Sequence, residues 1–274
     1  MPQHDIPLNT FGPTAGRKHL DGPSPRPKTL TVDLHNHLQT PAAAELVEPH
    51  LPENAFTGLQ YSNPKTQAII RDRATNRPTG YTDPEARIAD MDRMNLDVMA
   101  LSCVPGQFYY MTEPALGHEA SQIVNDNIHA KVKAHPKRFT GLGTIPMQDT
   151  DLALKELDRC VNELGFRGIQ IGARVMEEEL SSERLEPIWA RCEELGIVIF
   201  VHPRAFASTR FSRHYLTNIV GNPLDTTTAR HYLIFDGVME RYPIIKFYMA
   251  QGGAFASHNA ARMDHAYGAR EDLS

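Results

Sequence analysis

Two histidines separated by one residue, His35 and His37, directly follow a short β-prone run, Leu30-Thr-Val-Asp-Leu34. Side chains at positions i and i+2 of a strand point to the same side. Two neutral imidazoles on one side of a strand end supply half of a zinc site. A chance pair is the alternative interpretation, because the chain contains 13 histidines.

A third histidine, His202, closes the apolar run Ile197–Val201 and is followed by Pro203. It could be a hydrogen-bonded residue of the core. If both runs are parallel strands of one barrel, however, their carboxyl ends meet at the mouth where such enzymes keep their active sites. The pattern therefore predicts that His35, His37 and His202 bind a divalent metal ion, with zinc as the expected ion.

Strand-like and helix-like patterns alternate after residue 29. This alternation predicts βαβ units and a parallel sheet. An open, doubly wound sheet is the alternative, but the Gly-x-Gly-x-x-Gly phosphate turn of many such folds is absent. The six expected strands are 30–34, 97–103, 139–145, 166–171, 197–201 and 244–250.

The helices that connect these strands have recognisable starts and stops. Asp83 followed by Pro84 predicts a helix start, and Asp225 is expected to cap a helix that runs to about Tyr242. Residues 38–82, with many Pro, Asn, Gly and Thr, are expected to form a long irregular loop.

The bulk composition excludes several classes of protein. The chain has 274 residues with scattered Lys and Arg and a net charge of −5, so no nucleic-acid footprint stands out. No segment has the apolar length of a membrane span or a signal peptide. The three cysteines form no Cys-x-x-Cys pair, which favours reduced thiols in a cytoplasmic protein. We expect a flexible arm over residues 1–28 and a single barrel domain over 29–274.

Five motifs, taken in order, resemble the aminocarboxymuconate-semialdehyde decarboxylase family of the amidohydrolase superfamily. The resemblance runs from about residue 30 to residue 272. The motifs are His35-Asn-His37, Asp83-Pro-Glu-Ala-Arg87 with Met91-Asp92, Gly143-Thr-Ile-Pro-Met-Gln148, Leu164-Gly-Phe-Arg-Gly-Ile-Gln-Ile-Gly172 and Phe200-Val-His-Pro203. The resemblance implies a (β/α)8 TIM-type barrel, a divalent metal ion on His35, His37 and His202, and loss of CO2 from an unsaturated or aromatic carboxylate.

The chain departs from this family in two places. The family has an acid–base histidine at the end of its sixth strand, where this chain has Gln251. An amide does not titrate near pH 7, so Gln251 can only orient water or substrate. The family's last metal ligand is an aspartate at the end of an eighth strand. Because only about six strands are expected here, the barrel is expected to be incomplete at its C-terminal end.

Arginines are the expected ligands of a small-molecule carboxylate substrate. Arg262 matches a family arginine that reaches the substrate across a dimer, so a homodimer is expected. Arg204 follows the third histidine and is a second candidate. Arg77, in the long first loop, is a third candidate, although the spacing does not distinguish it from Arg71 and Arg73.

The expected activity is that of a metal-dependent carboxy-lyase. A proton must reach the carbon that loses CO2, and a water on the metal is the expected donor, because His258 is expected to point away. Two alternatives stay open. One is a hydrolase of a lactone or C–C bond in the same fold, and the other is an inactive, truncated family member.

Overall fold

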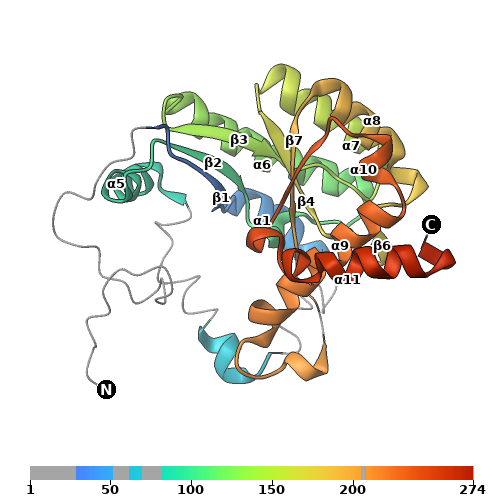
Figure 1. Ribbon diagram of the computed structural model, residues 1–274. Coiled ribbons are helices and arrows are strands. Elements are labelled where there is room, and N and C mark those ends of the chain that lie inside the picture. The colour runs from blue at the N-terminus through green and yellow to red at the C-terminus, as the bar shows by residue number, and fades with distance from the viewer. Residues whose placement is uncertain (1–28, 52–61, 70–81, 205, 207, 274) are drawn as a thin grey trace.

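Six parallel strands form one sheet in the order β1-β2-β3-β4-β7-β8 (Figure 1). The computed structural model describes residues 29–51, 62–69, 82–204, 206 and 208–273. Each of the six predicted strands overlaps an observed one, and the parallel arrangement is confirmed. Their bounds are β1 Val32–Leu38, β2 Val98–Cys103, β3 Phe139–Gly143, β4 Gly168–Gly172, β7 Val198–His202 and β8 Lys246–Met249. A short antiparallel pair, β5 (Arg174–Val175) and β6 (Glu178–Glu179), was not predicted.

Helices connect successive strands, and the sheet with its helices forms an incomplete TIM-type (β/α) barrel, as predicted (Figure 1). Among the described strands, β1 and β8 are the two edges of the sheet. The α-helices are α1 Pro41–Val47, α5 Pro84–Met94, α6 Pro114–Ala134, α7 Thr150–Asp158, α8 Glu186–Leu195, α9 Asn222–Phe235, α10 Val238–Arg241 and α11 Ala256–Ala269. α7 continues into one π-helical stretch, Arg159–Glu163.

Alternate residues of each strand pack on opposite faces of the sheet. Ile199 and Val201 of β7 belong to the large core cluster, together with buried side chains of α6, α7 and α8. Phe200, between them, belongs to a second cluster that includes Ala100 and Leu142. The helices therefore cover one face, and the other face carries the residues that surround the predicted site.

The predicted helix start at Asp83 is confirmed. Its Oδ1 accepts hydrogen bonds from the backbone N–H groups of Glu85 (2.9 Å) and Ala86 (3.4 Å). The prediction for Asp225 was wrong: α9 begins three residues earlier, and Asp225 lies buried within its first turn. The predicted helix is also interrupted before Tyr242, because Gly237 takes a left-handed conformation (φ 73°) between α9 and α10.

The prediction of an irregular segment over residues 38–82 was wrong in part. α1 starts with Pro41 at its first position, and its Ala43 and Val47 are fully buried. Residues 64–69 are also helical. Both pieces are too short to show a helical period in the sequence, and α1 is stabilised by packing on the core. The predicted arm over residues 1–28 lies outside the described residues.

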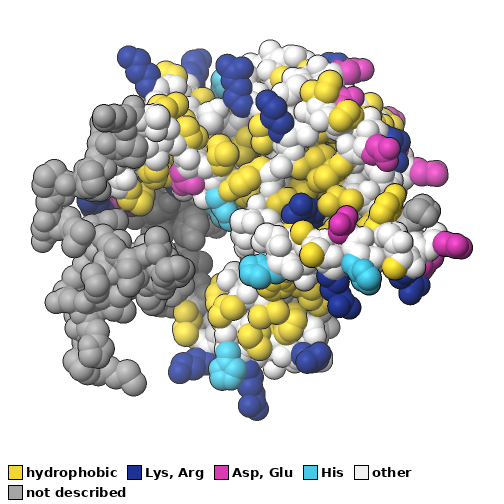
Figure 2. Space-filling model, viewed as in Figure 1, with side chains coloured by type: hydrophobic (Ala, Val, Ile, Leu, Met, Phe, Trp, Pro, Cys, Tyr) yellow, Lys and Arg dark blue, Asp and Glu magenta, His cyan; other side chains and the backbone are white. Residues whose placement is uncertain are grey.

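Hydrophobic side chains also reach the surface. Val32 and Leu34 on the edge strand β1 are each 43% exposed. On the face of the molecule drawn in Figure 2, further hydrophobic side chains gather over the strands, next to α11. No helix in the described part of the chain is long and apolar enough to cross a membrane. Cys103, Cys160 and Cys192 are buried and unpaired.

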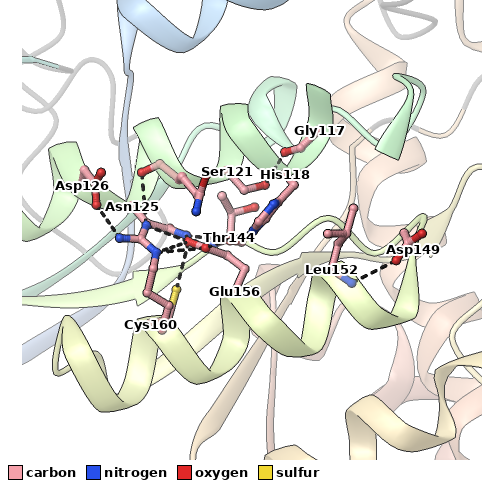
Figure 3. A network of polar contacts seen from close by, with 12 residues as sticks. Gly117, His118, Ser121, Asn125, Asp126, Thr144, Asp149, Leu152, Glu156 and Cys160 are labelled. Carbon is pink, nitrogen blue, oxygen red and sulfur yellow. Dashed lines mark hydrogen bonds and ion pairs between the residues drawn. The ribbon is translucent and has the colours of Figure 1, made fainter. Parts of the chain in front are cut away.

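A buried polar network joins α6, α7 and the end of β3 (Figure 3). Asn125 of α6 pairs with the backbone of Thr144: its Oδ1 accepts from Thr144 N, and its Nδ2 donates to Thr144 O, both at 2.8 Å. The same Nδ2 donates to the fully buried carboxylate of Glu156 (2.6 Å), which also binds Arg159. The network fixes the carboxyl end of β3, where the barrel has its mouth.

We expect Asn125→Ala to destabilise the fold strongly. The substitution leaves the buried N–H and C=O of Thr144 without partners and removes one donor from Glu156. At about 1–3 kcal/mol for each buried group left unpaired, the loss is on the order of 4 kcal/mol. Asn127→Ala on the same helix is the matched control, because Asn127 makes one partly buried hydrogen bond to Thr40. Denaturant unfolding of both variants measures the difference, and similar losses would contradict the role of the network.

Candidate metal centre

The three predicted histidines lie together. The ring centroids of His35 and His202 are 5.1 Å apart, those of His37 and His202 are 4.8 Å apart, and those of His35 and His37 are 5.1 Å apart. One nitrogen from each ring can be chosen so that all three lie within 4.8 Å of one another. β1 and β7 are not neighbours in the sheet, so its curvature brings these rings together.

Local geometry explains how β1 presents two of the rings. His35 and His37 lie within β1 and not after it, which corrects the predicted strand end. The register with β2 shifts between Asp33 and Asn36. Asp33 holds this irregularity, because its Oδ1 accepts from the His35 backbone N–H (3.0 Å) and its Oδ2 from Asn36 Nδ2 (3.4 Å).

Backbone carbonyls select the ring nitrogen that His37 and His202 can offer to a metal ion. His37 Nδ1 lies 3.0 Å from the carbonyl oxygen of Cys103, and His202 Nδ1 lies 2.7 Å from that of Pro203. A carbonyl only accepts hydrogen bonds, so Nδ1 carries the proton in both rings. The lone pair is then on Nε2, the arrangement that metal-binding histidines usually have.

Burial favours the neutral form of all three imidazoles. It lowers the pKa of His37 from 6.5 to about 4 and that of His202 well below 6.5. His35 lowers the pKa of His37 further, and His37 and His35 lower that of His202 further. The pKa of His35 is also lowered by burial, against the opposing effect of Asp33. Because neutral imidazole is the form that binds a metal ion, the three rings fit such a ligand.

Supporting contacts around His37 were not predicted. Arg87 of α5, which is buried, donates to the carbonyl oxygen of His37 (2.9 Å). Gln170 of β4 donates to the Cys103 carbonyl (3.2 Å), the acceptor that His37 also uses. A signal was present in the sequence for both, since Arg87 belongs to a motif of the resemblance and Gln170 is a polar residue inside an apolar strand.

Gln251 lies directly beyond β8, beside the end of β7. The backbone N–H of Ala250 donates to the carbonyl of Val201, the residue before His202. Gln251 has a left-handed backbone (φ 51°), and its Oε1 accepts a hydrogen bond from Thr226 Oγ1 (2.8 Å). Gln251 therefore follows β8 at the carboxyl end of the sheet, where His202 ends β7, and its amide contacts α9.

The arginine candidates have different surroundings. Arg204 is partly buried, two residues after His202, and burial lowers its pKa against the opposing effect of Tyr110. Arg262 is exposed on α11, as is His258. Arg77 lies outside the described residues. Of these candidates, Arg204 is thus the one that lies beside a predicted metal ligand in the chain.

A buried acid on α9 was missed as a feature of this region. Asp225 is 5% exposed, and its carboxylate lies 3.9 Å from Nε of Arg174, which is on β5. Burial raises the pKa of Asp225 from 3.8 to about 6, although Arg174 opposes the shift. Its sequence signal was misleading, because an aspartate near a helix start is usually a cap.

We expect this acid to make the stability depend on pH. Between about pH 4 and pH 6 the folded state holds a proton that the unfolded chain has lost, so the free energy of unfolding falls as the pH rises through this window. The loss amounts to at most about 3 kcal/mol, given about 1.4 kcal/mol per pKa unit. The Asp225→Asn protein should lack this pH-dependent part of the free energy of unfolding. Chemical unfolding of both proteins from pH 4 to pH 7 measures it, and parallel curves would disprove the assignment.

A sequence profile of the amidohydrolases (Amidohydro_2) matches residues 32–268. The chain belongs to the amidohydrolase family. Within this family, a 2-amino-3-carboxymuconate-6-semialdehyde decarboxylase of Dictyostelium discoideum is 34% identical over 248 residues, which are 90% of this chain and 69% of that protein. The predicted family is therefore confirmed.

Solved amidohydrolase structures share the fold. The crystal structure of 5-carboxyvanillate decarboxylase from Sphingomonas paucimobilis has a TM-score of 0.76 at 22% identity, covering 88% of this chain and 72% of that chain. Dihydroxybenzoic acid decarboxylase from Polaromonas sp. JS666, with bound manganese and 2-nitroresorcinol, has a TM-score of 0.72 at 21% identity, covering 88% and 71%. These relatives are decarboxylases, the class of enzyme that the sequence predicted.

Proposed function

We propose that this amidohydrolase binds a divalent metal ion and removes CO2, without oxidation, from a small unsaturated or aromatic carboxylate. The observation that carries the proposal is the cluster of three neutral imidazoles formed by His35, His37 and His202. The names of the relatives support the class of substrate. Zinc is the proposed ion, because imidazole ligands suit it, although several structural neighbours contain manganese.

Different residues of the chain would bind the metal ion and the substrate carboxylate. His35, His37 and His202 would hold the metal ion, which would supply a Lewis acid able to polarise a substrate oxygen. Arg204 would bind the substrate carboxylate, since a guanidinium pairs with both carboxylate oxygens. Arg262 of a partner subunit and Arg77 are further proposed carboxylate ligands, which makes the proposed enzyme a homodimer. Its proposed location is the cytoplasm.

The reaction consumes one proton. The bond between the ring or chain carbon and the carboxylate breaks, CO2 leaves, and the electron pair that stays on carbon takes up a proton. Gln251 cannot supply this proton, because an amide does not titrate near neutral pH. Solvent water is therefore the proposed source, and Gln251 orients a reactant in place of an acid–base group.

We expect CO2 release to depend on added metal. The protein, stripped with a chelator and reloaded with Zn²⁺ or Mn²⁺, should release CO2 from at least one of 2-amino-3-carboxymuconate 6-semialdehyde, 5-carboxyvanillate and 2,6-dihydroxybenzoate. The stripped protein should release none above background. No release with either metal and any of the three acids would refute the proposed activity.

A hydrolase of a lactone or C–C bond in the same fold is the second candidate. The specific observation in its favour is Gln251, because a reaction in which water attacks a polarised carbonyl does not need a proton donor at this position. The same metal-loaded protein distinguishes the two candidates. Consumption of water with no CO2 formed would favour the hydrolase.

A further inference from the structure

A buried hydroxyl of α9 holds the side chain of Gln251. Thr226 is fully buried, and its Oγ1 lies 2.8 Å from Gln251 Oε1. The next two residues of the helix, Thr227 and Thr228, donate instead to backbone carbonyls four residues back. Thr226 therefore differs from its neighbours, because it gives its proton to a side chain from another element.

This contact decides which end of the amide faces away from the helix. In the structure the Thr226 hydroxyl donates its single proton to the amide oxygen of Gln251, at 2.8 Å. The Nε2 group of Gln251, with two hydrogens, is then left without a protein partner in the described part of the chain. Held in this way, the amide presents its N–H groups, and not its oxygen, to a ligand.

The backbone after β8 is held in place by the same helix. Gln251 and Ala254 both have positive φ angles (51° and 57°), which residues with a side chain adopt only where the surroundings hold them. Thr227 Oγ1 accepts from the backbone N–H of Phe255 (3.0 Å), which anchors the end of this turn to α9. Thr226 thus holds the side chain of Gln251, and the next residue, Thr227, holds the backbone at the end of the turn.

We propose that Thr226 is a positioning residue: it fixes the Gln251 amide so that the Nε2 hydrogens bind the carboxylate of the substrate. The proposal rests on the proposed function and names the substrate group that Gln251 contacts. Gln251 follows β8 at the carboxyl end of the sheet, where His202 ends β7, and the proposal directs its two free donors toward a substrate bound there. A neutral donor with fixed direction binds an anionic oxygen and transfers no proton to it.

Thr226→Val is the test variant, because valine keeps the branched shape and removes only the hydroxyl. Thr226→Ser restores the hydroxyl, and Thr228→Val is the matched control, since it removes a helix-bonded hydroxyl two residues away. In protein labelled with 15N-glutamine, the side-chain amide resonances of Gln251 should shift in Thr226→Val and stay unchanged in the other two variants. This measurement needs no ligand. Unchanged resonances in Thr226→Val would overturn the proposal.

Binding of two probes to the metal-loaded protein tests the recognised group. We expect Thr226→Val to bind 2,6-dihydroxybenzoate about tenfold more weakly than the unsubstituted protein, the equivalent of one hydrogen bond to a charged group. Resorcinol, which lacks the carboxylate, should bind both proteins equally. Equal weakening for both probes, or none for either, would contradict the role in carboxylate binding. If the unsubstituted protein binds neither probe, the proposed function fails and the amide resonances alone decide the role of Thr226.

Discussion

His202→Ala should abolish metal-dependent activity by removing one of the three imidazole ligands. Loss of a hydrogen bond that merely supports a ligand typically lowers metal affinity by about 10–100-fold, so loss of the ligand itself is expected to cost at least about a hundredfold. The reason is local: His202 is buried, its Nδ1 faces the Pro203 carbonyl, and its Nε2 is the atom left for the metal. Zinc affinity, measured by competition with a chromophoric chelator, tests this expectation.

The control for this experiment is His258→Ala. His258 is exposed on α11 and should have no effect on zinc affinity or CO2 release. The folding of His202→Ala can be checked by circular dichroism. Replacement of a buried imidazole whose pKa is lowered by burial should leave the fold intact at neutral pH, where the ring is uncharged. Unchanged zinc affinity in a folded His202→Ala protein would exclude the proposed metal centre.

Gln251→His should raise the rate of CO2 release, because it introduces a group that can deliver a proton to carbon. A positioned general acid or base contributes about 10²–10⁴-fold, and we expect a gain near the lower end because no other residue has adapted to it. Histidine tolerates the left-handed backbone of position 251 better than most residues. The gain should fade as the pH rises above about 6.5, where an imidazole loses its proton.

Gln251→Asn is the matched control, since it keeps an amide at a position with positive φ. It should show neither the gain in rate nor the new pH dependence. The experiment measures CO2 release against pH for the three proteins with the same metal. A Gln251→His protein that is folded and binds metal, but is no faster than the unsubstituted protein at pH 6, would show that proton delivery does not limit this reaction.

The sequence by itself determined the six strands of the main sheet and the family. The six strands were predictable because apolar runs of four to seven residues between helical patterns are local signals, and the parallel sheet followed from their alternation. His35, His37 and His202 were identifiable because each stands at or near the end of such a run. Asp83 was recognised as a helix start because an N-cap bonds to groups only two or three residues away.

Only the tertiary structure decided how these residues work together. The curved sheet brings β1 and β7 close, and the carbonyl of Cys103, from another strand, selects the nitrogen that His37 can offer. The burial of Asp225 and its raised pKa depend on neighbours far along the chain, as does the hydrogen bond from Thr226 to Gln251. Propensity and spacing report on contacts within a few residues. The tautomer of His37, the pKa shifts and the amide orientation are set by groups that meet only when the sheet and its helices have packed.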